Sequence, residues 1–158
     1  MKAVVQRVAG GKVTVDGNEV GAINKGLMVL LGVSNSDTDA ELCYLADKII
    51  NLRIFEDEDG KMNLSLSEIG GELMVISQFT LYGNCKKGRR PSFIKAGEPA
   101  HAEKLYKEFI DKTKELGVSK VAQGVFGGDM KIDIRCDGPI TILLDTEELM
   151  PKKQPEGE

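Results

Sequence analysis

Two hydroxyl side chains and an amide stand together at the end of an apolar run near the middle of the chain. Ser77, Gln78 and Thr80 follow the residues ELMVI, and a serine or threonine hydroxyl becomes a nucleophile when a base removes its proton. Side chains alternate along a strand, which would put Ser77 and Phe79 on the face opposite Thr80. Ser77 and Thr80 can therefore face one pocket only if the strand ends or bulges between them. Otherwise these are ordinary strand residues with satisfied hydrogen bonds.

A glycine–proline pair is the second candidate. Gly138-Pro139 follows Asp137 between two apolar stretches, and an X–Pro bond is cis in about 5–6% of cases in folded proteins. A cis bond would bring the two flanking carbonyls to one side as acceptors, whereas a plain turn is the simpler interpretation. Arg7 lies inside another apolar stretch, either on a solvent face or buried and paired. Only the buried arrangement would indicate a role.

A basic cluster is the third candidate. It contains Lys86, Lys87, Arg89 and Arg90 around a glycine, and such a cluster can hold phosphate groups. A solvated surface run explains the same composition equally well. The net charge of the whole chain is -4, so any contact with a nucleic acid must come from a local patch of this kind.

Other chemistries are excluded by composition. His101 is the one histidine, and it falls in the first turn of a predicted helix, where a positive charge opposes the helix dipole. Mechanisms that need two histidines are excluded, and three distant cysteines argue against disulfides and cysteine-rich zinc sites. We expect no metal and no cofactor. Aromatic residues make up only 5% of the chain, which argues against a base-stacking platform.

The surrounding elements must position these groups. The pattern predicts an α+β fold: a single domain with a small β-barrel or curved mixed sheet and two main helices. Helices are predicted over 37–51 and 100–116, from apolar residues at three- and four-residue steps. Asp16-Gly17 predicts a hairpin turn, and residues 56–60 predict a charged turn. Strands are predicted near residues 2–8, 11–15, 19–23, 27–33, 72–81, 119–125, 130–136 and 140–145.

The chain as a whole fits one domain. Its 158 residues suggest a domain over 1–149 and a flexible, polar C-terminal tail over 150–158. The longest apolar run is far short of the roughly 20 residues that a bilayer requires, so no membrane contact is expected. A secretory leader is not visible either, which predicts a cytoplasmic location.

Five segments together resemble the D-aminoacyl-tRNA deacylase family, also called D-tyrosyl-tRNA deacylase. The resemblance spans essentially the whole chain to about Leu149, and three small residues depart from the usual family pattern: Cys136 for Asn, and Gly83 and Gly128 for Ala. The segments are VVQRV around Arg7, SQFTL at 77–81, KKGRRPSF at 86–93, FGGDM at 126–130 and DGPIT at 137–141.

The resemblance implies a homodimer with active sites at the subunit interface. It implies hydrolysis of the ester between a D-amino acid and the terminal adenosine of tRNA, and also of glycyl-tRNA. One subunit would supply the Ser77–Thr80 segment, and the other a cis Gly138-Pro139 pair held by Arg7. The substrate pocket would include Phe126 and Met130. The basic loop would contact the tRNA through Lys86, Lys87, Arg89 and Arg90.

An aminoacyl ester is already activated, so modest assistance suffices for its hydrolysis. We expect attack by water, with backbone N–H groups around Phe79 and Thr80 stabilising the oxyanion and the 2′-hydroxyl of the adenosine assisting proton transfer. A Thr80 nucleophile is the second choice. The Gly138 and Pro139 carbonyls would bind the α-amino group and exclude L side chains. The alternatives are a non-catalytic nucleic-acid-binding dimer and a small-ester hydrolase with a threonine nucleophile.

Overall fold

Strand β1 (Lys2–Val15) is the centre of a mixed six-stranded sheet in this computed structural model, which describes residues 1–151. It pairs antiparallel with three strands, and the sheet continues through two parallel pairings, β3 with β6 and β6 with β7. The other strands are β2 (Asn18–Ile23), β3 (Gly26–Gly32), β6 (Glu72–Ser77), β7 (Val121–Gln123) and β8 (Met130–Asp145).

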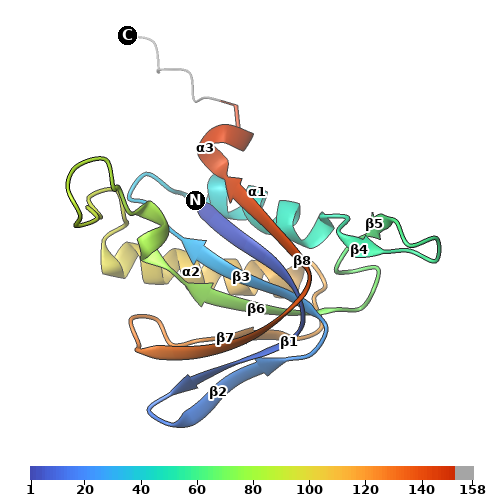
Figure 1. The fold of residues 1–158 in the computed structure, drawn as a ribbon. Coiled ribbons are helices and arrows are strands. Elements are labelled where there is room, and N and C mark those ends of the chain that lie inside the picture. The colour runs from blue at the N-terminus through green and yellow to red at the C-terminus, as the bar shows by residue number, and fades with distance from the viewer. Residues whose placement is uncertain (152–158) are drawn as a thin grey trace.

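The sheet curves until its two ends approach each other (Figure 1). A Cβ atom at Gly21 on β2 would lie only 2.8 Å from the backbone oxygen of Gln123 on β7, so glycine permits this close approach. The prediction of a curved mixed sheet or small barrel in one domain is confirmed, because the sheet is a nearly closed barrel.

Strands β1 and β8 are longer than predicted. The sequence predicted a break near Gly10-Gly11 in β1 and another between 136 and 140 in β8. The break in β1 does not occur, because Gly10 and Gly11 pair with Arg135 and Ile134 of β8, a pairing that local propensity does not reveal. At the second position the ladder is interrupted, but β8 continues as a single strand. The register does shift: Val8 faces Cys136 while Gln6 faces Thr141. Four residues of β8, 137–140, therefore stand opposite Arg7 as a bulge.

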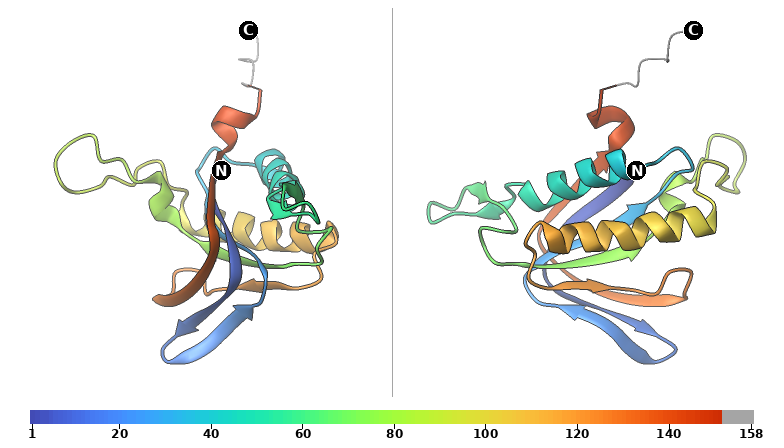
Figure 2. Two further views of the ribbon diagram at one scale, coloured as in Figure 1. Left: turned by 45° about the vertical axis from the view of Figure 1, so that its right-hand side comes forward. Right: turned by 180° about the vertical axis from the view of Figure 1, so that it is seen from behind.

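Two helices cover one side of the sheet, as the view from behind shows (Figure 2). Helix α1 (Asp39–Asn51) begins at a capping box formed by Thr38 and Glu41, and α2 (Pro99–Glu115) begins at a proline in its first turn. Both lie within two residues of the predicted helices. Their apolar stripes pack with β1, β3 and β6 into the main core, which includes Leu45, Ile49, Leu105 and Phe109.

Three short elements were not predicted. Strands β4 (Phe55–Glu56) and β5 (Met62–Leu64) form a hairpin whose turn is the charged segment predicted at 56–60, and α3 (Thr146–Leu149) follows β8. None of them is long enough to show a periodic pattern in the sequence.

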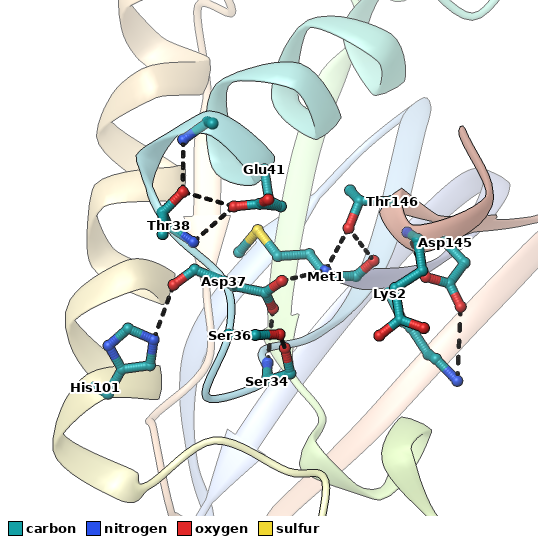
Figure 3. Close-up of polar contacts among 12 residues, drawn as sticks. Met1, Lys2, Ser34, Ser36, Asp37, Thr38, Glu41, His101, Asp145 and Thr146 are labelled. Carbon is teal, nitrogen blue, oxygen red and sulfur yellow. Dashed lines mark hydrogen bonds and ion pairs between the residues drawn. The ribbon is translucent and has the colours of Figure 1, made fainter. Parts of the chain in front are cut away.

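The first residue of the chain is buried near the start of α1 (Figure 3). The ammonium group of Met1 donates to a carboxylate oxygen of Asp37 and to the hydroxyl of Thr146, each at 2.6 Å. The other oxygen of Asp37 accepts from the Ser34 N–H at 2.6 Å. These contacts join β1, the loop before α1 and α3, which lie far apart in the sequence.

The predicted C-terminal tail over 150–158 falls almost wholly outside the described residues, which include only its first two positions. Across residues 1–151, no helix combines the length and apolar content that a membrane crossing requires.

Candidate active site

Strand β6 ends at Ser77, four residues earlier than predicted. The Gln78 N–H still donates to the Leu31 oxygen at 2.8 Å, and the chain then turns into a short 3₁₀ helix, η1 (Phe79–Tyr82). The prediction of a strand to residue 81 was wrong because the neighbouring strand β3 ends at Gly32, which leaves no ladder partner for a longer β6. The strand end removes the strict alternation that would have separated Ser77 from Thr80.

Two backbone donors are free at this turn. In a 3₁₀ helix each N–H bonds to the carbonyl three residues before it, so the first N–H groups have no partner inside the helix. Here the first such bond comes from Leu81, whose N–H donates to Gln78 at 3.3 Å. Within residues 1–151, neither the Phe79 nor the Thr80 N–H has a hydrogen-bond partner. Two adjacent free donors can stabilise an oxyanion.

Phe79, one of the two donor residues, lines a pocket of about 580 Å³, and Thr80 follows it directly in the chain. Its lining includes Ser77, Gln78 and Phe79 together with the predicted substrate residues Phe126 and Met130. The structure therefore brings together five of the residues that the sequence singled out. Apolar side chains from β3, from the residue that follows it and from α2 form much of the remaining wall, including those of Leu31, Val33, Pro99 and Ala102. Such a mostly apolar cavity with a few polar groups is typical of a ligand site.

Tyr106 belongs to the hydrophobic core and also lines the pocket, and the sequence did not single it out as a site residue. It lies on α2, is 2% exposed, and its hydroxyl donates to the Val75 oxygen at 2.7 Å. Its ring lies 5.9 Å from that of Phe126. Burial raises the pKa of Tyr106 to about 12, so the hydroxyl stays neutral and serves as a donor. The signal in the sequence was a hydroxyl-bearing residue on an otherwise apolar helix stripe.

Thr80 lies beside the pocket and does not line it. Its side chain is exposed, and its hydroxyl accepts a hydrogen bond from the Gln78 amide. An amide cannot take a proton from a hydroxyl, and no other side chain among residues 1–151 is bonded to Thr80. This environment lacks the base that a threonine nucleophile requires.

The one histidine lies elsewhere. The Nε2 atom of His101 is 3.1 Å from the backbone oxygen of Asp37, near the start of α1 (Figure 3). It does not line the pocket at Ser77. In the described part of the chain, no three side chains of His, Cys, Asp or Glu come together as metal ligands.

Arg7 is buried and paired, which is the arrangement that indicates a role. It is 6% exposed, and its Nη1 atom donates to the Ile54 oxygen at 2.8 Å. Its Nε atom donates to the Asp137 oxygen at 3.1 Å and lies 3.5 Å from the carboxylate of the same residue. The guanidinium therefore holds the start of the β8 bulge.

The bulge carries the Gly138-Pro139 pair, whose peptide bond is cis. Both residues are exposed, and neither lines the pocket at Ser77 of the same chain. Gly138 has a φ of +127°, and a Cβ atom there would lie 2.9 Å from Ile140. Only glycine fits this position without strain.

The basic residues lie on a loop that projects from the end of η1 (Figure 1). Asn84 and Ser92 close its base with two backbone hydrogen bonds of 2.7 and 2.9 Å. Lys86, Lys87, Arg89 and Arg90 are all exposed, and within residues 1–151 none of them forms an ion pair.

Comparisons with known proteins identify the family of this chain. The sequence model of the D-Tyr-tRNA(Tyr) deacylase family matches residues 4–145. A D-aminoacyl-tRNA deacylase from Clostridioides difficile (strain 630) is 58% identical over 148 residues, covering 94% of this chain and 99% of the relative. Another from Natranaerobius thermophilus is 57% identical over 149 residues, with the same coverage.

Two solved structures share the fold. The c-Myc DNA Unwinding Element Binding Protein superposes with a TM-score of 0.87 at 42% identity, covering 92% of this chain and 98% of that one. A probable eukaryotic D-amino acid tRNA deacylase superposes with a TM-score of 0.79 at 19% identity, covering 90% and 97%. From the family match and these relatives, the chain belongs to the D-Tyr-tRNA(Tyr) deacylase family.

Proposed function

We propose that this member of the family hydrolyses the ester of D-aminoacyl-tRNA to free tRNA and a D-amino acid, with water as the nucleophile. The observation that carries the mechanism is the pair of free N–H groups at Phe79 and Thr80, beside the pocket that Ser77 and Phe79 line. An ester carbonyl held there would direct its oxygen at two donors. Loss of one such donor typically costs about 2.7–4 kcal/mol of barrier.

Water attack needs no base from a side chain, because an aminoacyl ester is already activated. The water oxygen bonds to the carbonyl carbon, and the negative charge on the carbonyl oxygen is stabilised by the two N–H groups. The bond to the 3′-oxygen then breaks, and the 2′-hydroxyl of the terminal adenosine relays the proton to that leaving oxygen. The side chain of Thr80, bonded only to Gln78, is left outside the reaction.

Chiral selection requires a second copy of the chain in this proposal. Gly138 and Pro139 are exposed and do not line the pocket of their own chain, so they are accessible to the pocket of a partner. Their carbonyls would accept from the substrate α-amino group and fill the space of an L side chain. Glycine has no side chain to exclude, so glycyl-tRNA would also be hydrolysed.

The outer edge of β8 supports a homodimer with active sites at the interface. Strand β8 pairs only with β1 among the described strands, so its other edge is unpaired. Leu143 on this strand is 76% exposed and Ile134 is 38% exposed. Unpaired backbone and exposed apolar side chains on one strand are suited to contact with a second subunit.

The basic loop would bind phosphates of the tRNA acceptor end. Lysine and arginine contacts to phosphate add affinity without reading sequence, which suits an enzyme that serves many tRNAs. Aminoacyl-tRNA as substrate also implies that the reaction takes place in the cytoplasm.

A deacylation assay with D-Tyr-tRNA and L-Tyr-tRNA tests the proposed function. We expect turnover of the D-form and little or none of the L-form. A non-catalytic nucleic-acid-binding dimer is the second candidate, favoured by the basic loop and by the name of the 42% identical DNA unwinding element binding protein. Absence of D-Tyr-tRNA turnover would contradict the proposed enzyme and favour the non-catalytic nucleic-acid-binding dimer.

A further inference from the structure

Two exposed phenylalanines are in contact beside the pocket: Phe79 lines it, and the ring of Phe93 packs against that of Phe79. Phe79 is 57% exposed and Phe93 is 36% exposed, with their ring centroids 5.2 Å apart and the ring planes at 72°. These are two of the chain's five phenylalanines. Large apolar side chains in contact at a surface mark a binding site when they adjoin a pocket. The low aromatic content had argued against a stacking platform, but content does not show that two rings gather at one place.

The ring pair is held firmly in place. The backbone bonds between Asn84 and Ser92 close the loop next to Phe93, and the Ala96 N–H donates to the Phe93 oxygen at 3.0 Å. A Cβ atom at Gly83 would lie 3.2 Å from the Phe93 ring, so the glycine backbone packs against that ring. A surface that is ordered before binding loses little conformational entropy when a ligand arrives.

The chain segment that carries both rings is strongly positive. No acidic residue occurs between Glu72 and Glu98, and this stretch carries the basic loop together with Lys95. Its five cations have no ion-pair partner among residues 1–151. Exposed rings beside unneutralised cations are complementary to an unpaired nucleotide, whose base has a flat π face and whose phosphate is anionic.

We infer that Phe79 and Phe93 form a stacking surface for the unpaired base that precedes the terminal adenosine of the bound tRNA. The inference rests on the proposed function, which puts the ester against the Phe79 and Thr80 N–H groups and the terminal nucleoside in the pocket. The single-stranded end of the tRNA would then leave the pocket past the two rings and continue toward the basic loop. Stacking tolerates any base, so the surface fixes the path of the strand and does not select a sequence.

The stacking surface is tested with uncharged tRNA that carries 2-aminopurine in place of the base before the terminal adenosine. Stacking on an aromatic ring quenches this fluorophore, so wild-type protein should reduce its emission. Phe93→Ala and Phe93→Leu should abolish the quenching and weaken tRNA binding by about 5- to 150-fold, the usual effect of one base–aromatic stack. The leucine variant keeps apolar bulk and removes only the π face.

Ile94→Ala is the matched control. Ile94 is 88% exposed on the same loop and has no ring, so its loss should leave quenching and affinity unchanged. Equal quenching by wild type and Phe93→Ala would overturn the inference. So would a change in the oligomeric state of Phe93→Ala by sedimentation, because the rings would then pack against a second copy. If wild-type protein failed to hydrolyse D-Tyr-tRNA, the proposed function would be contradicted. That result is distinguishable from failure of the stacking surface, because the fluorescence experiment uses uncharged tRNA.

Discussion

The guanidinium of Arg7 donates to the backbone oxygen of Asp137 at 3.1 Å, although the two residues are 130 positions apart in the sequence. The same group donates to the Ile54 oxygen at 2.8 Å, so one buried side chain joins β1, the residue before the β4–β5 hairpin and the bulge of β8. Gly138 and Pro139 directly follow the residue that it holds. In the proposed function, Arg7, Gly138 and Pro139 together form the chirality gate, the group that excludes L side chains, and Arg7 positions the other two through Asp137.

Arg7→Lys should disturb this gate. A lysine ammonium lacks the planar fork that reaches two carbonyls at once, so one buried carbonyl loses its partner. We expect a loss of about 1–3 kcal/mol in the free energy of unfolding, measured with urea. The rate ratio of D-Tyr-tRNA to L-Tyr-tRNA hydrolysis should also fall. Lys12→Ala is the control, since its ion pair with Asp133 is long, at 3.9 Å, and solvent-exposed. An unchanged D/L ratio in Arg7→Lys would contradict the positioning role.

Gly138→Ala should reduce chiral selection by displacing the carbonyl groups of Gly138 and Pro139. A Cβ atom would lie 2.9 Å from Ile140 in a backbone conformation that L residues rarely adopt. We expect slower hydrolysis of D-Tyr-tRNA and a smaller D/L ratio, measured by single-turnover deacylation. Gly60→Ala is the matched control, because Gly60 also has a positive φ, +74°, in the β4–β5 turn, with no atom within 4 Å of the added Cβ. Equal effects of the two variants would mean that backbone strain alone is responsible.

Two substitutions at Thr80 distinguish the role of its hydroxyl from the role of its backbone N–H. Thr80→Ala removes only the side chain and should keep most of the activity. Thr80→Pro removes the N–H, which has no partner to lose within residues 1–151, and should lower kcat by about 10²–10³. Circular dichroism and the unfolding midpoint check that the proline variant folds. If Thr80→Ala were as inactive as Thr80→Pro, a threonine nucleophile would replace water in the mechanism.

Tyr106 predicts a particular dependence of stability on pH. Its pKa is raised to about 12 in the folded state against about 10 when unfolded, so the folded protein holds this proton more tightly. The resulting stability is complete below about pH 10 and is lost as the pH rises toward 12. As the pH rises from about 10 to about 12, the free energy of unfolding should fall less in Tyr106→Phe than in wild type. The difference should reach roughly 2 kcal/mol. Parallel pH curves for the two proteins would show that Tyr106 is not the group responsible.

The basic loop predicts a dependence on salt. Binding of tRNA should weaken as salt rises, and the slope of log K against log salt should shrink by about 0.7–0.9 for each phosphate contact removed. Lys86→Ala with Lys87→Ala tests this by fluorescence titration. Lys61→Ala with Lys114→Ala is the charge-matched control, since both residues are exposed and lie outside the loop. Equal slopes for the two double variants would exclude the loop from phosphate binding.

Much of the fold could be predicted from local patterns. The apolar stripes of both long helices, the Thr38 cap, the proline in the first turn of α2 and the Asp16-Gly17 turn each depend on residues within a few positions of one another. The break expected in β1 did not occur, and β8 continues as one strand past its bulge at 137–140, because the ladder between these strands joins residues more than 100 positions apart. Pairing over that distance leaves no local signal.

The sequence by itself determined which groups are available: two hydroxyls and an amide at 77–80, one histidine, a Gly-Pro pair and a cluster of cations. These counts decided which chemistries the chain can perform, since composition does not depend on conformation. Only the tertiary structure decided that β6 stops at Ser77 and frees two N–H groups, that Phe126 and Met130 face the same pocket, and that Arg7 is buried. Each of these depends on where a distant segment ends or packs, and burial and register are properties of the assembled sheet.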